Sequence, residues 1–133
     1  MLQPNKILVI RFSSLGDLIL TSPIFRELRR IFPGANLNLL TSVGFGDVLD
    51  NNPHLDRIIK HPRKENFEQL NQLIEELQAE EFDLIYDAHR SMRSRWIVSR
   101  LTAFGMKRQP AVWKIDKRTL NRKLLIHLGW NRL

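Results

Sequence analysis

The opening of the chain combines a short apolar run with a tight polar loop and a helical segment. Residues 7–12 are mostly apolar, positions 13–17 read SSLGD, and residues 18–32 place apolar side chains at helical spacing. Strand, loop and helix in this order form the first unit of an open parallel sheet, whose ligand crevice lies at the carboxyl ends of the strands. Backbone N–H groups at the start of the helix add a partial positive charge there. The order therefore predicts a ligand site at this loop and puts the carboxylate of Asp17 where it can take part in chemistry.

The same alternation continues along the chain and predicts the fold class. Helical segments separate the apolar runs, as expected for parallel strands that are covered by helices on both faces. We therefore predict an α/β fold, a Rossmann-like parallel sheet with helices on both faces, in a single domain over residues 1–133. The predicted strands lie at residues 7–12, 37–41, 57–60 and 82–87, with a fifth near 109–113.

Two of the predicted helices have clear patterns. Asn66 and Gln69 have the spacing of a capping box at the start of a helix over residues 66–79. A second helix is expected over residues 91–104, because apolar side chains recur there at helical spacing. The side chains expected to face the core are Phe67, Leu70, Leu73, Ile74 and Leu77 in the first of these helices, and Met92, Trp96, Ile97 and Leu101 in the second.

Pro23 leaves two interpretations of the helix that follows Asp17. It either kinks one long helix or occupies the first turn of a second helix capped by Ser22. The second arrangement costs less, because an N–H at that position would have no helical partner. Pro33 and Gly34 then end the helix and turn the chain toward the next strand.

The composition narrows the class of protein. The chain has no cysteine, which excludes a disulfide framework and a thiolate metal site and suits a reducing compartment. The four histidines show no spacing that indicates a metal site. No leader-like segment opens the chain, and charges interrupt each apolar run well before the ~20 residues of a membrane span. We therefore expect a cytoplasmic protein.

Charge is divided unevenly along the chain. Residues 1–88 hold nine Lys and Arg against thirteen Asp and Glu, whereas residues 89–133 hold twelve against one, so their net charges are −4 and +11. The basic third predicts an anionic partner, such as a phosphate-bearing glycolipid, a membrane surface or nucleic acid. Alternatively, it is a face that an acidic domain outside this chain would balance. A non-catalytic module that binds nucleic acid or another polyanion is the rival interpretation, although the sequence has no helix-turn-helix, RNA-recognition or zinc-finger pattern.

Two segments also resemble a known family. The sequence ILVIRFSSLGDLILTSPIFRELRRIFPGANLNLLT is similar to the opening of the heptosyltransferases that build the inner core of lipopolysaccharide, the two-domain ADP-heptose enzymes of glycosyltransferase family 9. Residues 82–94, FDLIYDAHRSMRS, resemble that family's strand ending in Asp with its following loop and basic residue. His89 and Arg90 stand where family members often have glutamine and glycine, which leaves the acceptor's identity open. A dinucleotide-binding oxidoreductase domain is a third interpretation, but the G-x-G-x-x-G spacing it needs is absent.

The resemblance implies a role for the aspartate of the first motif. In that family it is the base that deprotonates the acceptor hydroxyl during attack on the anomeric carbon of the donor, and Asp17 matches it directly. The alternative is an ordinary acidic residue in the first turn of a helix. Ser13, Ser14 and Gly16 would form the supporting loop, which offers hydroxyls and a close backbone approach to sugar or phosphate. The same residue types also serve ordinary turns.

Basic residues that match the family's acceptor contacts are the next candidates. The family places a cation after the strand that ends in Asp, and Arg93 aligns with it. A guanidinium can bind a carboxylate or a phosphate through two parallel hydrogen bonds. Arg63, Lys64 and Arg118 lie near further such positions by a looser alignment. For each of these cations, a solvated surface residue is the alternative interpretation.

As a whole, the resemblance implies the N-terminal, acceptor-binding half of a GT-B glycosyltransferase. Heptose would pass from ADP-heptose to an anionic lipid-linked acceptor with inversion, without a metal or other cofactor, and nucleic acid would not be a partner. The C-terminal domain that holds the nucleotide-sugar is absent from residues 1–133, so we expect this chain alone to be inactive or nearly so. The basic, amphipathic residues 117–128 could contact that domain or lie on the inner membrane as a peripheral attachment.

Overall fold

A computed structural model describes residues 4–12, 22–44, 49–62, 66–103 and 109–114. Over these residues the chain forms one five-stranded sheet in which every strand pair is parallel. The strand order is β3-β2-β1-β4-β5, that of a doubly wound α/β sheet. The elements are β1 (Lys6–Ile10), α2 (Ser22–Ile31), β2 (Asn36–Ser42), β3 (Arg57–His61), α3 (Phe67–Glu80), β4 (Leu84–Asp87), α4 (Met92–Leu101) and β5 (Ala111–Lys114).

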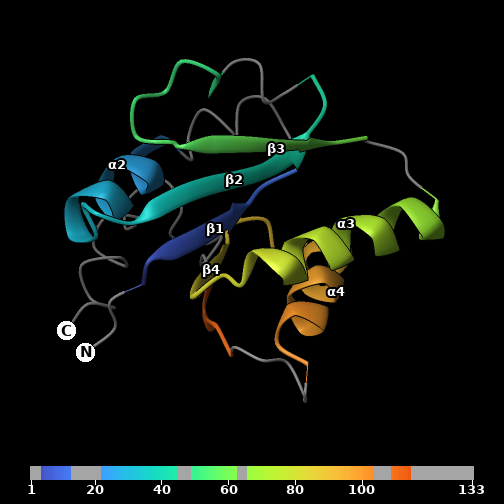
Figure 1. Cartoon of the computed structure of the whole chain (residues 1–133). Helices are drawn as coiled ribbons and strands as arrows, with labels where there is room; N and C mark the ends of the chain where they lie inside the picture. The colour runs from blue at the N-terminus through green and yellow to red at the C-terminus, as the bar shows by residue number, and fades with distance from the viewer. Residues whose placement is uncertain (1–3, 13–21, 45–48, 63–65, 104–108, 115–133) are drawn as a thin grey trace.

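Helices cover both faces of the sheet, with α2 on one side and α3 and α4 on the other (Figure 1). In β1, Ile7 and Val9 join the core cluster under α2, while Leu8 and Ile10 join the cluster under α3 and α4. All four side chains are buried. A strand that is covered on both faces has no polar side to alternate with, which explains its nearly unbroken apolar sequence. The prediction of a Rossmann-like parallel sheet is confirmed.

All five predicted strands are present, and their ends agree with the predicted ones to within two residues. The apolar run at 7–12 is longer than its strand, because β1 ends at Ile10. The backbone N–H of Arg11 still donates to the carbonyl of Leu40 at 3.0 Å. Beyond that bond, Arg11 and Phe12 turn toward the segment that follows β4, as described below.

Pro23 lies where the second interpretation puts it, but Ser22, the expected cap, is itself the first residue of α2. The choice between one kinked helix and two helices depends on residues 13–21, outside the described residues, and stays a prediction. Pro23 is the second residue of α2 and lies in its first turn, where its missing N–H costs no helical hydrogen bond. The turn at Pro33 and Gly34 separates α2 from β2, as predicted. Among the helices of the described segments, none combines the length and the hydropathy needed to cross a membrane.

The capping box of α3 is confirmed, but one member of its predicted apolar stripe is not buried. The Asn66 side chain accepts a hydrogen bond from the Gln69 N–H at 2.8 Å, and the Gln69 side chain accepts one from the Asn66 N–H at 3.1 Å. Phe67, which was expected to face the core, is 69% exposed. Phe67 is the first residue of α3. The later turns of α3 cover the sheet, but its first turn extends past the sheet (Figure 1).

The inward face of α4 also differs from the prediction. Met92 is 88% exposed and Trp96 is 42% exposed, so neither belongs to the core. Ser94 is fully buried instead, and its hydroxyl donates to Asp87 Oδ2 at 3.1 Å. This bond holds Ser94 against the end of β4 and thereby sets the rotation of α4, which leaves the side of Met92 and Trp96 facing outward. Ile97 and Leu101 are buried, as predicted.

Polar contacts at the amino ends of the strands hold the sheet to its neighbours. Asp56 Oδ2 accepts the Leu37 N–H at 2.7 Å and a hydrogen bond from Arg29 at 2.7 Å. Glu80 accepts from Lys6 Nζ at 2.5 Å and from Arg57 at 3.2 Å. The hydrogen bond from the Leu37 N–H, and after it the bond from Arg29, lowers the pKa of Asp56. The hydrogen bond from Lys6, together with the nearby charge of Arg57, lowers the pKa of Glu80.

These lowered pKa values predict that acid destabilises the fold. Both carboxylates favour folding while ionised, so their contribution is complete above the unfolded pKa values of about 4 and is lost as pH falls through the lower folded values. We expect the free energy of unfolding in urea to fall between pH 5 and pH 3, and less steeply in an Asp56→Asn, Glu80→Gln variant. Equal slopes in the variant and the parent chain would contradict this assignment.

Candidate functional site

The carboxyl ends of β1 and β4 lie side by side, and the segments that follow them are joined by hydrogen bonds. Ile10 pairs with Asp87 in the sheet, and the Ala88 N–H donates to the carbonyl of Ile10 at 3.1 Å. The guanidinium of Arg11, 7% exposed, donates to the carbonyl of Ala88 at 2.8 Å. The Phe12 N–H donates to Nδ1 of His89 at 2.9 Å. The loop that leaves β1 therefore starts from a fixed position against the β4–α4 turn.

Asp87 organises that turn. Its carboxylate is 2% exposed and accepts from the backbone N–H of His89 at 3.1 Å, from that of Arg90 at 2.7 Å, and from the Ser94 hydroxyl at 3.1 Å. An aspartate that bonds to backbone N–H groups two and three residues ahead closes a tight turn. Arg90 has the left-handed φ of 55° within it. Asp87 thus joins the end of β4 to α4 and is a positioning residue.

Arg93 reaches from the first turn of α4 to the end of the β1 segment. Its Cζ lies 3.7 Å from the centroid of the Phe12 ring, a stacked cation–π contact. The centroids of the Phe12 and His89 rings are 5.8 Å apart. Phe12 is the residue immediately before the SSLGD motif. The structure therefore brings one predicted site residue, Arg93, next to the place where the motif begins.

The other predicted site residues lie outside the described residues. These are Ser13, Ser14, Gly16 and Asp17 of the motif, together with Arg63, Lys64 and Arg118. The basic residues 117–128 also lie outside them. Their roles stay predictions. The described chain fixes the two ends between which the motif must run, Phe12 after β1 and Ser22 at the start of α2.

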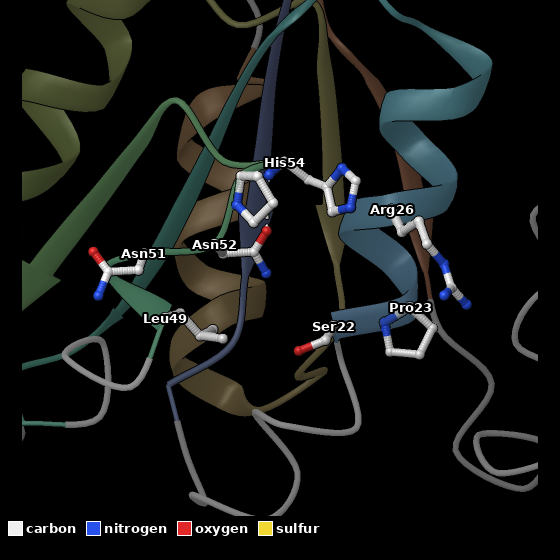
Figure 2. A pocket seen from close by; sticks show the side chains of 8 residues that line it. Ser22, Pro23, Arg26, Leu49, Asn51, Asn52 and His54 are labelled. Carbon is white, nitrogen blue, oxygen red and sulfur yellow. Dashed lines mark hydrogen bonds between the residues drawn. The ribbon is translucent and has the colours of Figure 1, made fainter.

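A surface pocket of about 410 Å³ lies at the first turns of α2 (Figure 2). Residues 49–54, between β2 and β3, face the first turns of α2 across it. The segment is held by a hydrogen bond from the His54 N–H to Asn52 Oδ1 at 2.9 Å and by one from Arg29 to the His54 carbonyl at 2.9 Å. No carboxylate is among the described residues that line it: Ser22, Pro23, Arg26, Leu49, Asn51, Asn52, Pro53 and His54. Hydroxyl, amide and guanidinium groups of this kind suit a polar or anionic ligand.

Several residues of this region had no assigned role from sequence alone. Arg11, Phe12 and His89 form the junction between the two strand ends, and Asp87 had been noted only as the end of a strand. The rule that parallel strands end at the same edge would have placed them together, because β1 and β4 are neighbours. Among the residues described, no three His, Asp or Glu side chains form a group that could hold a metal ion.

Comparison with known proteins points to one class of enzyme. No family model matches the chain. In sequence it is 26% identical over 118 residues to lipopolysaccharide heptosyltransferase 1 of Pseudomonas aeruginosa, covering 80% of this chain and 33% of that protein. It is 28% identical over 111 residues to lipopolysaccharide heptosyltransferase 1 of Escherichia coli K12, covering 77% of this chain and 34% of that protein. The chain thus spans about a third of the length of these curated relatives.

Solved structures agree on the fold. A glycosyl transferase of family 9 from Veillonella parvula superposes with a TM-score of 0.78 at 22% identity, over 97% of this chain and 43% of that one. The E. coli heptosyltransferase WaaC, solved with ADP-2-deoxy-2-fluoro heptose, superposes with a TM-score of 0.67 at 23% identity, over 92% of this chain and 40% of that one. The parallel sheet is therefore of the GT-B glycosyltransferase type. In sequence the chain is similar to lipopolysaccharide heptosyltransferases, which confirms the resemblance seen in its two motifs.

Proposed function

We propose that this chain is the acceptor-binding, base-supplying part of a glycosyltransferase that moves heptose from ADP-heptose to the inner core of lipopolysaccharide. The observation that carries the proposal is the SSLGD motif in a heptosyltransferase relative, set between the end of β1 and the start of α2. This is the edge at which open parallel sheets bind their ligands. Arg93 lies beside the residue that precedes the motif.

The proposed reaction assigns each group a simple task. An acceptor hydroxyl attacks the anomeric carbon of the donor, so a carbon–oxygen bond forms while the bond from that carbon to the phosphate oxygen breaks. ADP leaves with the electron pair, and Asp17 takes the proton from the attacking hydroxyl. Attack on the face opposite to ADP inverts the anomeric configuration. No metal or other cofactor is required in this scheme, and the nucleotide-sugar is held chiefly by a second domain outside this chain, so residues 1–133 alone would transfer little or no heptose.

Cations and polar groups around the crevice would hold the acceptor. Arg93 is suited to a carboxylate or phosphate of the acceptor, because a guanidinium binds such groups through two hydrogen bonds and its contact with the Phe12 ring holds it near the motif. We assign supporting contacts to Ser13, Ser14 and Gly16, and looser ones to Arg63, Lys64 and Arg118. An acceptor that is an anionic, lipid-linked oligosaccharide places the protein at the cytoplasmic face of the inner membrane, and nucleic acid is not a partner in this scheme.

Replacing Arg93 tests the acceptor assignment. In the longest natural product that contains this chain, Arg93→Ala should raise the KM for a deacylated inner-core acceptor about ten-fold or more, with a smaller change in kcat, because a hydrogen bond between charged groups contributes about 1.5–3 kcal/mol. The KM for ADP-heptose should not change. Arg30→Ala removes the same charge from an exposed site at the far end of α2 and serves as the matched control. An unchanged acceptor KM in Arg93→Ala would remove Arg93 from the site.

A further inference from the structure

The outer side of α4 carries an unusual combination of side chains. Met92 is 88% exposed and Trp96 is 42% exposed, and their spacing of four residues puts them on the same side of the helix. Arg95 is exposed beside them, and Cζ of Arg100 lies 5.7 Å from the centroid of the Trp96 ring. We call Met92, Arg95, Trp96 and Arg100 the α4 surface. The sequence of α4, MRSRWIVSRL, contains no acidic residue.

This apolar surface is not required by the core of the domain. Ile97 and Leu101 are the apolar residues of α4 that enter the core cluster, and Ser94 faces the end of β4. The exposed methionine and tryptophan therefore lie on the side of the helix opposite to its packing contacts. Neighbouring exposed apolar side chains rimmed by charged residues form the kind of patch that marks a protein or membrane interaction site.

The chemistry of the α4 surface matches an anionic lipid bilayer. Tryptophan is favoured at the boundary between headgroups and acyl chains, where its ring is buried and its N–H stays hydrated. Arginine side chains lay their apolar stems along the same boundary and bring their charges to lipid phosphates. Phe67 of α3 is also an exposed aromatic residue, but the charges around it are negative, because it is followed by Glu68 in a helix with no basic residue.

The position of α4 adds a geometric argument. Its first residue is Met92, and the next, Arg93, stacks on Phe12 at the candidate site. A bilayer that contacted Met92 and Trp96 would therefore lie beside the edge of the sheet at which β1 and β4 end.

We propose that the α4 surface binds the anionic surface of a lipid membrane. The benefit of such binding rests on the proposed function, since an enzyme with a lipid-linked acceptor has to reach that acceptor at the membrane. The binding itself needs neither donor nor acceptor, so its failure and the failure of the transferase proposal are distinguishable.

Co-sedimentation with vesicles tests the proposal directly. The full chain should bind vesicles of phosphatidylcholine with one-third phosphatidylglycerol, bind pure phosphatidylcholine at least ten-fold more weakly, and be released by high salt. The double variant Met92→Ser, Trp96→Ser should bind the anionic vesicles about ten-fold or more weakly than the parent chain. The double variant Arg95→Gln, Arg100→Gln should lose about five-fold in vesicle affinity for each arginine replaced. Phe67→Ser is the matched control and should bind like the parent chain. Circular dichroism confirms that each variant is folded.

Trp96 fluorescence separates this surface from the basic carboxyl-terminal residues. With Trp113→Phe and Trp130→Phe, Trp96 is the one remaining indole. Its emission should shift to shorter wavelength on anionic vesicles and be quenched by brominated acyl chains. Unquenched emission from vesicle-bound protein, or full binding by the Met92→Ser, Trp96→Ser variant, would overturn the proposal and assign binding to residues 117–133. A Trp96 shift caused by single-stranded RNA but not by vesicles would overturn it in favour of a nucleic acid.

Discussion

Asp17→Asn is expected to reduce heptose transfer by about 10²–10⁴-fold in the longest natural product that contains this chain. The substitution keeps the shape of the side chain but removes the group that accepts the proton, and positioned general bases typically contribute that factor. The loss should appear in kcat, with the KM for donor and acceptor nearly unchanged, because the amide can still make the contacts of a bound hydroxyl. Steady-state transfer to a deacylated inner-core acceptor measures all three values.

A matched control accompanies this variant. Glu76→Gln makes the same chemical change at an exposed position of α3 and should leave transfer as in the parent protein. If Asp17→Asn retained transfer within about three-fold, Asp17 would be an acidic residue at the start of a helix, worth only ~0.3–1 kcal/mol to folding. The base would then have to be sought elsewhere.

Asp87→Ala is expected to cause the second large effect, a loss of about 3 kcal/mol or more in the free energy of unfolding. The buried carboxylate accepts three hydrogen bonds, and its removal leaves the buried Ser94 hydroxyl and the partly buried N–H groups of His89 and Arg90 without this acceptor. Each buried group left without a partner costs about 1–3 kcal/mol. Urea unfolding of the chain followed by circular dichroism gives the value.

Ser94→Ala serves as a comparison for Asp87→Ala and should have a smaller effect on the free energy of unfolding. It removes one of the three bonds to Asp87 and also the bond that the Ser94 hydroxyl accepts from the Ser91 N–H in the cap of α4, so it should cost about 1–2 kcal/mol. We also expect Arg93 to become more mobile in this variant, because Ser94 fixes the rotation of α4 and Arg93 is on the same helix. A free energy of unfolding for Asp87→Ala within 1 kcal/mol of the parent chain would contradict the assignment of Asp87 as the organiser of the β4–α4 turn.

The strands could be predicted because each carries its own signal. β1 is apolar from Ile7 to Ile10 because it is buried on both faces. β2 combines three buried leucines with buried polar residues, and its signal was the leucine run bounded by the turn at Pro33 and Gly34. The capping box at Asn66 is likewise a local signal, formed within four residues. Local patterns of this kind were sufficient for the order of elements and for the parallel sheet.

The details that could not be predicted depend on contacts between distant segments. Helical spacing alone allowed several rotations of α4, and the bond between Asp87 and Ser94 selected the one that exposes Met92 and Trp96. The bond from Arg11 to Ala88 joins residues 77 positions apart, so no local pattern indicates it.

The candidate site could be predicted only through its motifs. Arg93 was found because it follows a strand that ends in Asp, and the structure places it beside Phe12. The residues that hold the strand ends together, Arg11 and Asp87, are polar side chains whose burial depends on the pairing of β1 with β4. That pairing follows from topology, and a single sequence does not specify it uniquely.

Transfer of heptose by the longest natural protein that contains residues 1–133 tests the central claim most directly. The purified protein would be incubated with ADP-heptose and a deacylated inner-core acceptor, and both the glycosylated product and released ADP would be measured. We expect equal amounts of the two, a product of inverted configuration, and neither from residues 1–133 alone. Release of ADP without glycosylated product, or no reaction with this donor and acceptor while other nucleotide-sugars are used, would contradict the assignment as a heptosyltransferase.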